Sequence, residues 1–135
     1  MLGNHSPALN LAVRDLEVAR RFYAETLGLT QVSEMEGLID FRSGNVMLYV
    51  YQSEFAGTNQ ATAATWSVGE EIETMVTTLK SRGVSFEHYT NIPGLTVQGD
   101  IHVGGQPDGS AGEFKVAWFR DPDGNLLCLT NGRSA

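Results

Sequence analysis

One strand-and-helix pattern occurs twice in this chain at a spacing of 55 residues, and this repeat limits the possible folds more than any other feature of the sequence. Apolar and polar residues alternate up to Val13, as in a strand with one buried face, and the same alternation returns up to Val68. Each strand precedes an amphipathic helical pattern, which ends at Gly28 in the first copy and at Gly83 in the second. Because strand ends and helix ends keep the same spacing, the sequence indicates a duplicated structural unit.

Each copy continues with three further predicted strands. They are expected near 31–35, 38–42 and 46–52 in the first copy and near 84–89, 113–120 and 125–131 in the second. A Gly-Asn pair, at Gly44 in one copy and Gly124 in the other, marks a hairpin turn before the last strand. The predicted fold is therefore α+β, with two βαβββ modules in a single domain over 1–135. The expected parts are a first module at about 6–52, a polar linker at 53–62 and a second module at about 63–132.

The alternation divides the first strand of each module between a face under the helix and a helix-free face. Asp15 is expected to cap the first helix. The residues expected under the helices are Leu9, Leu11 and Val13 in one module and Ala64, Trp66 and Val68 in the other. The residues expected on the helix-free faces are Ala8, Asn10 and Ala12 and, in the repeat, Ala63, Thr65 and Ser67. These small and polar side chains leave volume and hydrogen-bonding groups for a ligand.

Residues 90–112 lie outside the repeat and hold six of the fifteen glycines. A loop of this length is uncommon in a compact domain unless it is functional or mobile. Two interpretations stay open, a lid or wall over a ligand site and a surface insertion. His102 lies in this segment and is expected to contact a ligand if the segment folds over the site.

The composition excludes several classes of partner. The net charge is −7 and the nine basic residues are scattered, so no Lys/Arg stripe for nucleic acid is present. No stretch approaches the roughly 20 apolar residues that cross a bilayer. The single cysteine excludes an internal disulfide and, with no signal-like segment at Met1–Ser6, predicts a cytoplasmic protein. The acidity is explained by ordinary solubility or by attraction of cationic ligands.

Two segments carry a family resemblance. They are Leu11–Leu29, with the aromatic pair Phe22-Tyr23 before Leu27-Gly28, and Trp118–Asn125, with Asp121-Pro122-Asp123-Gly124. Both resemble signatures of the vicinal oxygen chelate superfamily, which includes glyoxalases, bleomycin resistance proteins and dioxygenases, and the resemblance covers nearly the whole chain. It implies that each sheet curls into a half-barrel with its helix on the convex face. It also implies a homodimer, since relatives often form two-fold dimers.

The resemblance also implies where a metal would be held. Catalytic relatives bind one divalent ion through a residue on the first strand, usually His, and one on the last strand, usually Glu, of each module. The corresponding positions here are Ala8, Leu48, Ala63 and Cys128. Three of them carry no donor atom, and Cys128 is either a soft ligand or reactive thiol, or a small buried residue. We therefore expect no metal and no cofactor.

The candidate ligand-binding residues follow from these positions. They are Asn10, Ala12, Leu48, Thr65, Ser67, His102, Trp118 and Cys128. By alternation from Leu48, Tyr49 is expected to face the helices. No convergent pair of titratable groups is evident, so no catalytic residue is assigned.

The predicted function is metal-free binding of a small molecule, with sequestration of a toxic or antibiotic-like compound as in the bleomycin-resistance subgroup that the chain resembles. The alternative is a metal-independent or atypical-site lyase or isomerase of the same superfamily. Such an enzyme would recruit His102 or Cys128.

Overall fold

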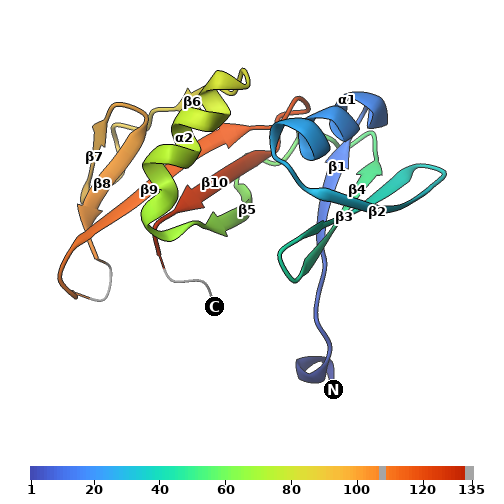
Figure 1. Ribbon diagram of the computed structural model, residues 1–135, viewed down its shortest axis with the longest axis horizontal. Coiled ribbons are helices and arrows are strands. Elements are labelled where there is room, and N and C mark those ends of the chain that lie inside the picture. Colours follow the sequence, from blue (N-terminus) through green and yellow to red (C-terminus); the bar gives the residue numbers. More distant parts are fainter. Residues whose placement is uncertain (107–108, 133–135) are drawn as a thin grey trace. The chain divides into compact units, whose positions relative to one another are not determined.

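A computed structural model describes residues 1–106 and 109–132 and divides the chain into two units (Figure 1). Unit 1 comprises residues 1–63 and 121–125, and unit 2 comprises the described residues of 64–120 and 126–135. Each unit contains one sheet and its own helix, so the fold is α+β, as predicted. Of the segment 90–112, residues 107 and 108 lie outside the described residues.

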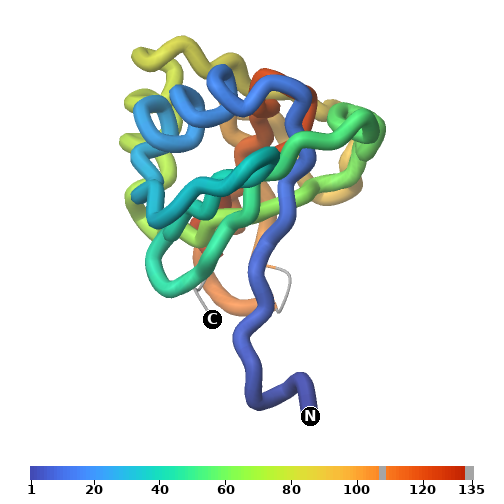
Figure 2. The backbone as a smooth tube through the Cα atoms, turned by 90° about the vertical axis from the view of Figure 1, so that its right-hand side faces the viewer, coloured from blue at the N-terminus to red at the C-terminus, as the bar shows by residue number. Residues whose placement is uncertain are grey.

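Unit 1 is built on a four-stranded sheet with the order β1-β4-β3-β2. Its elements are η1 (Leu2–Asn4), β1 (Leu9–Val13), α1 (Leu16–Arg21), η2 (Phe22–Thr26), β2 (Thr30–Met35), β3 (Leu38–Ser43) and β4 (Val46–Gln52). Strands β1 and β4 are parallel neighbours, and the other pairs are antiparallel hairpins. The four strands predicted for the first module are confirmed. The N-terminal residues before β1 lead away from this sheet (Figure 2).

The first helix begins and ends where the sequence predicts. The Asp15 carboxylate accepts hydrogen bonds from the backbone N–H groups of Glu17 and Val18, at 3.0 and 3.2 Å, which confirms the predicted cap. The helix continues as a π-helical segment, since the Leu27 N–H donates to the Phe22 carbonyl at 2.9 Å. Gly28 follows at a φ of +75°, a backbone conformation that other residues rarely adopt.

The core of unit 1 lies between α1, η2 and one face of the sheet. Its fully buried strand residues are Leu11, Val13, Ile39, Phe41, Leu48 and Val50. From the helical side, the ring of Tyr23 lies 5.9 Å from that of Phe41. Leu48 pairs with Leu9 and Phe41 and therefore points toward the helix, because paired residues share a face.

The prediction that placed Leu48 on the helix-free face and Tyr49 under the helix is therefore wrong by one residue. Phe41 pairs with Leu48 in unit 1, and Phe119 pairs with Leu127 in unit 2. Tyr49, rather than Leu48, is thus the counterpart of Cys128. Moving the register of a strand by one residue turns each of its side chains to the opposite face of the sheet. The error of one residue therefore assigned Leu48 and Tyr49 to the wrong faces.

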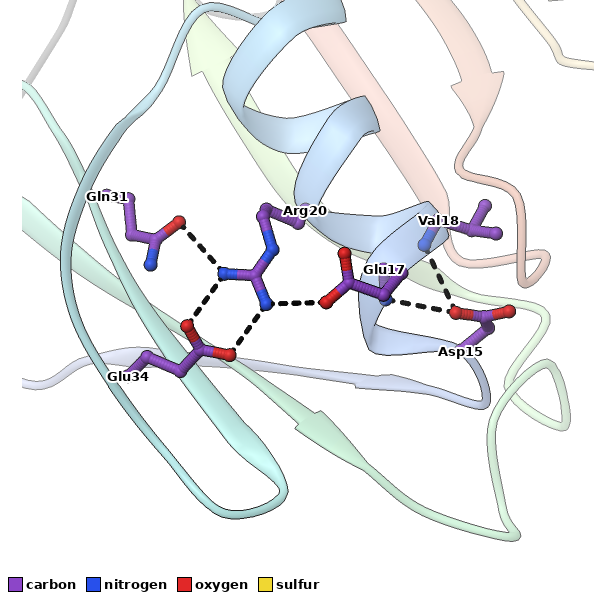
Figure 3. Close-up of polar contacts among 6 residues, drawn as sticks. All are labelled: Asp15, Glu17, Val18, Arg20, Gln31 and Glu34. Atoms are coloured by element: carbon purple, nitrogen blue, oxygen red, sulfur yellow. Dashed lines mark hydrogen bonds and ion pairs between the residues drawn. The ribbon is translucent and has the colours of Figure 1, made fainter.

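An ion-pair network ties the outer surface of α1 to the edge strand β2 (Figure 3). The Arg20 guanidinium donates to both carboxylate oxygens of Glu34, at 2.6 and 2.8 Å, and to Glu17 at 2.8 Å. Arg20 lowers the pKa of Glu34 through this hydrogen bonding. All six residues of β2 are exposed, so this strand buries little apolar surface, and exposed ion pairs of this kind contribute little to stability.

Unit 2 repeats the strand–helix order on a second sheet. Its elements are β5 (Thr62–Ser67), η3 (Gly69–Glu71), α2 (Ile72–Ser81), β6 (Phe86–Glu87), β7 (Leu95–Gln98), β8 (Ile101–Gly105), β9 (Glu113–Arg120) and β10 (Leu126–Thr130). The strand order is β5-β10-β9-β8-β7, and β6 also pairs with β9. Helix α2 lies over this sheet (Figure 1) and buries Ile72, Val76 and Leu79.

The segment 90–112 is not a structureless loop, because it contains β7 and β8. Both β6 and β8 run antiparallel to β9 along the same edge, so residues 88–100 are an insertion that interrupts one strand. In unit 1 the matching strand β2 has a β-bulge at Val32, and the 55-residue repeat carries Val32 onto Glu87, where the insertion begins. His102, expected in a loop, is a buried residue of β8.

Candidate functional site

Several side chains of unit 2 that could contact a ligand lie together on the helix-free face of the second sheet. Lys115 on β9 pairs with Glu73 on α2, so Lys115 and the alternate residues after it face the helix. Trp118 therefore points to the other side, together with its cross-strand partner Cys128 on β10. His102 pairs with Val116, two residues before Trp118, and so shares this face.

Three rings on this face, Tyr89, His102 and Trp118, form an aromatic cluster. The His102 and Trp118 ring centres lie 4.9 Å apart at 84°, and those of Tyr89 and Trp118 lie 5.4 Å apart at 83°. Tyr89 and His102 are 5.8 Å apart. The two pairs with Trp118 are edge-to-face, and all three distances lie in the range that is favourable for aromatic pairs, so the rings pack against one another.

His102 brings a hydrogen-bond donor into this cluster. Its Nε2 accepts the backbone N–H of Tyr89 at 2.8 Å, which places the proton of the neutral ring on Nδ1. Burial lowers the pKa of His102 below its ordinary value, the backbone of Val116 opposes that shift, and His88 adds to it. The side chain is 0% exposed, and Nδ1 makes no hydrogen bond of normal geometry among the described residues; its contact with the Val116 backbone, which opposes the lowered pKa, is too loose to count as one. A buried polar atom without a partner is uncommon, and a bound water or ion or a functional role accounts for such atoms.

Cys128 borders the cluster as a protonated thiol. Burial raises the pKa of Cys128 to about 11, although a hydrogen bond with the Thr65 side chain works in the opposite direction. The residue is 4% exposed. A nucleophile or a metal ligand needs the thiolate, so at neutral pH this sulfur acts as a small apolar group.

Alkylation of Cys128 by iodoacetamide near pH 8 is expected to be at least about a hundredfold slower in the native protein than in urea. The raised pKa leaves about a hundredth of the thiolate that an ordinary cysteine would have, and burial slows access further. Mass spectrometry of timed samples measures the rate, because the chain has one cysteine. Equal rates in native and unfolded protein would refute this account of the thiol.

An ion pair stands beside the aromatic cluster. Arg120 Nε donates to Glu87 Oε1 at 2.7 Å, and the hydrogen bond to Glu87, assisted by Tyr89, raises the pKa of Arg120. Glu87 pairs with Trp118 across the strands and so lies on the same face. The cluster therefore has neutral rings at its centre and a charged pair at its border.

The structure brings together four of the predicted site residues. His102, Trp118, Cys128 and Thr65 lie on one face of unit 2, with Thr65 and Cys128 in contact. Ser67 lies two residues further along β5 and is exposed.

Sequence reasoning missed Tyr89, Glu87 and Arg120. Tyr89 and Glu87 both fall in the predicted strand 84–89, and alternation along it places them on one side, opposite Phe86. This alternation could have identified Tyr89 and Glu87 as neighbours on one face. It does not show that the chain later returns to the same edge of the sheet with His102.

Asn10 and Ala12 lie on the helix-free face of unit 1. Asn10 is beside Tyr49 of β4, which is in turn beside Asp40 of β3. The Asp40 carboxylate accepts a hydrogen bond from the Ser33 hydroxyl at 2.6 Å, and its other oxygen is buried without a partner in the described chain. This face thus offers a hydrogen-bond acceptor beside a tyrosine.

The residues at the metal-ligand positions implied by the resemblance do not fit a metal. With the register corrected, these positions hold Ala8, Tyr49, Ala63 and the protonated thiol of Cys128. Divalent ions of this kind need several deprotonated N, O or S donors. Within residues 1–106 and 109–132, no three side chains of His, Cys, Asp or Glu form a group that could hold a metal ion.

One comparison with known proteins identifies a family. The model of the Glyoxalase/Bleomycin resistance protein/Dioxygenase superfamily matches residues 6–129. No match is found among curated proteins. No helix in the described part of the chain has both the length and the apolar character to span a membrane.

Solved structures of similar fold cover almost the whole chain. A glyoxalase/bleomycin resistance protein/dioxygenase from Alicyclobacillus acidocaldarius is 19% identical, with a TM-score of 0.69, covering 94% of this chain and 90% of its own. An integron cassette protein from the mobile metagenome of a Halifax Harbour sewage outfall is 21% identical, with a TM-score of 0.66, covering 93% and 96%. The fosfomycin resistance protein FosX from Mesorhizobium loti is 13% identical, with a TM-score of 0.65, covering 94% and 91%. At these identities the likeness shows the fold alone.

Proposed function

Because the chain belongs to the glyoxalase/bleomycin resistance protein/dioxygenase superfamily, we propose that it is a metal-free small-molecule binding protein that sequesters its ligand without transforming it. The proposed site is the aromatic cluster on the helix-free face of unit 2. The observation that carries the proposal is the buried Nδ1–H of His102, which makes no hydrogen bond of normal geometry in the described chain and lies among aromatic rings.

The chemistry of this face favours binding over the alternative of a lyase or isomerase. A metal-independent reaction of that type needs a general base within reach of the substrate. The one basic nitrogen of His102 already accepts the Tyr89 N–H, and the Cys128 sulfur is protonated. Small-molecule binding sites, in contrast, commonly contain aromatic rings with a few polar groups, as this face does.

The metal-free character of the proposal rests on the side chains at the family's ligand positions. Two alanines, a phenol and a buried thiol stand where donors would be needed. The superfamily's usual electrophilic chemistry depends on such an ion, so its loss leaves a binding scaffold.

The proposed ligand is a planar aromatic compound that carries a hydrogen-bond acceptor. Its ring would pack against Trp118 and Tyr89, and its acceptor would receive the His102 Nδ1–H. Because this atom is fully buried in the structure, binding requires the side chains that cover it to move aside. The net charge of −7 favours a ligand that also bears a positive charge. Fosfomycin resistance is a property of FosX itself, and the similar fold of that protein is consistent with a protective role against a toxic compound here.

A Trp118→Leu variant is expected to bind such a ligand about 30-fold more weakly than the wild type, because truncating a central aromatic residue typically costs about 2 kcal/mol of binding free energy. The ligand is found by thermal-shift screening of planar aromatic compounds with carbonyl or ring-nitrogen acceptors, since a ligand of the folded state raises the melting temperature. Calorimetric titration then measures the Kd.

Trp66→Leu is the matched control, because Trp66 lies on the face of β5 opposite Thr65, away from the cluster. This variant should bind with nearly the wild-type Kd. The proposal fails if no compound stabilises the protein, or if both tryptophan variants bind equally well. A stoichiometric metal in protein purified without chelators would refute its metal-free character.

We also propose that the protein is a cytoplasmic homodimer that binds neither nucleic acid nor membranes. The single buried cysteine supports a cytoplasmic location, and the acidic composition argues against nucleic-acid binding. The dimer rests on the two-fold dimers that relatives often form. Light scattering during size-exclusion chromatography would test the dimer.

A further inference from the structure

We propose that His102 is a pH-sensitive latch that holds the start of the 88–100 insertion against the sheet by accepting the backbone N–H of Tyr89. This conformational device goes beyond ligand binding, because it acts whether or not the cluster holds a ligand.

The latch lies where the insertion leaves the sheet. The chain departs from the edge of β9 after Glu87 and rejoins it at β8, so Tyr89 is no longer held by strand pairing. Its N–H donates instead to His102 Nε2 at 2.8 Å, and its ring packs against His102 and Trp118. Only an unprotonated nitrogen can accept this hydrogen bond, because both ring nitrogens of a charged imidazole are donors.

Among the residues that the structure describes, the elements around His102 offer no unpaired charge that would stabilise its protonated form. On the sheet side its neighbours are Val97, Val116 and Trp118, and β10 contributes Cys128 and Thr130 to this face. From the insertion, His88 opposes protonation of His102. The carboxylates of the neighbouring segments are engaged, Asp100 with Lys80 and His88, and Glu87 with Arg120.

The direction of the pH effect follows from the lowered pKa of His102. Burial holds this pKa below its ordinary value of 6.5, so the folded latch favours the neutral ring. The stability that the latch contributes is fully present above pH 6.5, declines below it, and is lost once the pH has fallen through the lowered pKa. After protonation two donors face each other, and the Tyr89 backbone must move away.

A second histidine lies at the start of the insertion and contacts its other end. His88 Nε2 lies 2.9 Å from Asp100 Oδ1, and Asp100 also pairs with Lys80 of α2 at 2.6 Å. These contacts join the two ends of the insertion independently of the His102 latch. If the cluster binds a ligand, acid would also release it, a consequence that rests on the proposed function.

The test is amide hydrogen exchange of the ligand-free full chain by NMR between pH 8 and pH 5. After correction for the intrinsic exchange rate, the opening equilibrium at the Tyr89 amide should rise about tenfold for each pH unit between 6.5 and the lowered pKa, and then level off. Amides in the centre of β10 should show no such dependence. The ring signals of His102 should titrate with the same lowered midpoint.

Two variants separate the latch from general acid sensitivity. In His102→Gln the side-chain oxygen can accept the Tyr89 N–H at every pH, so the dependence should vanish. In His88→Gln it should remain. A wild-type Tyr89 amide whose opening ignores pH, or a dependence that persists in His102→Gln, overturns the latch. If His102→Gln does not fold, the wild-type midpoints decide, and a mismatch between the His102 ring and the Tyr89 amide overturns it. Because no ligand is added, this outcome is independent of the binding proposal.

Discussion

Replacing Asp121 by alanine is expected to lower the free energy of unfolding by about 3–5 kcal/mol, because it removes the centre of a buried hydrogen-bond network. The carboxylate is 4% exposed. It accepts the Tyr23 hydroxyl at 2.7 Å, the Asp123 N–H at 3.0 Å, and the Asn125 backbone and side-chain N–H groups, both at 2.8 Å. Alanine would leave these donors without their acceptor.

The network joins the 121–125 turn to the helix and first strand of unit 1. Tyr23 comes from the π-helical segment, and the Asn125 side chain also donates to the carbonyl of Ala12 in β1 at 2.8 Å. Burial raises the pKa of Tyr23 well above its ordinary value, so its hydroxyl remains a donor throughout the usual pH range. This explains how a turn distant in the sequence becomes part of unit 1.

Urea denaturation followed by circular dichroism measures the loss. Tyr23→Phe is the matched control, because it removes one donor without leaving the carboxylate bare, and it should cost about 1–2 kcal/mol. A loss in Asp121→Ala no larger than that of Tyr23→Phe would show that the network does not act as a unit.

Replacing Gly57 by alanine is expected to destabilise the protein by about 2–4 kcal/mol, from two separate causes. Gly57 has a φ of +75°, where an L side chain is strained. In addition, a Cβ at this position would lie 2.5 Å from the Asp123 carbonyl oxygen, a backbone atom that cannot move alone. The close approach shows that the polar segment 53–62 packs against the turn of unit 1, where Ala56 is also fully buried.

Gly37→Ala separates the two causes. Gly37 has nearly the same φ, +78°, but a Cβ there would meet nothing within 4 Å. This control should cost only the conformational strain, about 1–2 kcal/mol. The difference between the two variants in urea denaturation measures the steric contact, and equal losses would mean that this contact is absent in solution.

Much of the local structure could be predicted from the sequence. The alternation before Val13 and Val68, the cap at Asp15 and the glycine after the first helix each specify structure through a few neighbouring residues. The motifs near the two ends of the chain also identified the superfamily. Of the residues predicted for the site, Thr65, His102, Trp118 and Cys128 lie on one face, and their role in ligand binding stays a prediction.

Two features of the site could not be predicted in this way. Alternation sorts the residues of β4 into two sets, but only the pairing of Leu48 with Leu9 and Phe41 shows which set lies under the helix. Likewise, the glycines of 90–112 indicated an irregular segment, while the pairing of β8 with both β7 and β9 makes it part of the sheet.

The sequence by itself therefore determined the helices and strands, because these depend on residues close together in the chain. It also determined the duplication and the family, because these depend on recognisable motifs. Only the tertiary structure decided that Tyr49 rather than Leu48 matches Cys128, and that His102 accepts a hydrogen bond from Tyr89 within an aromatic cluster. Strand register and the return of the inserted segment are set by contacts between residues far apart in the chain, and periodicity along the chain does not encode those partners.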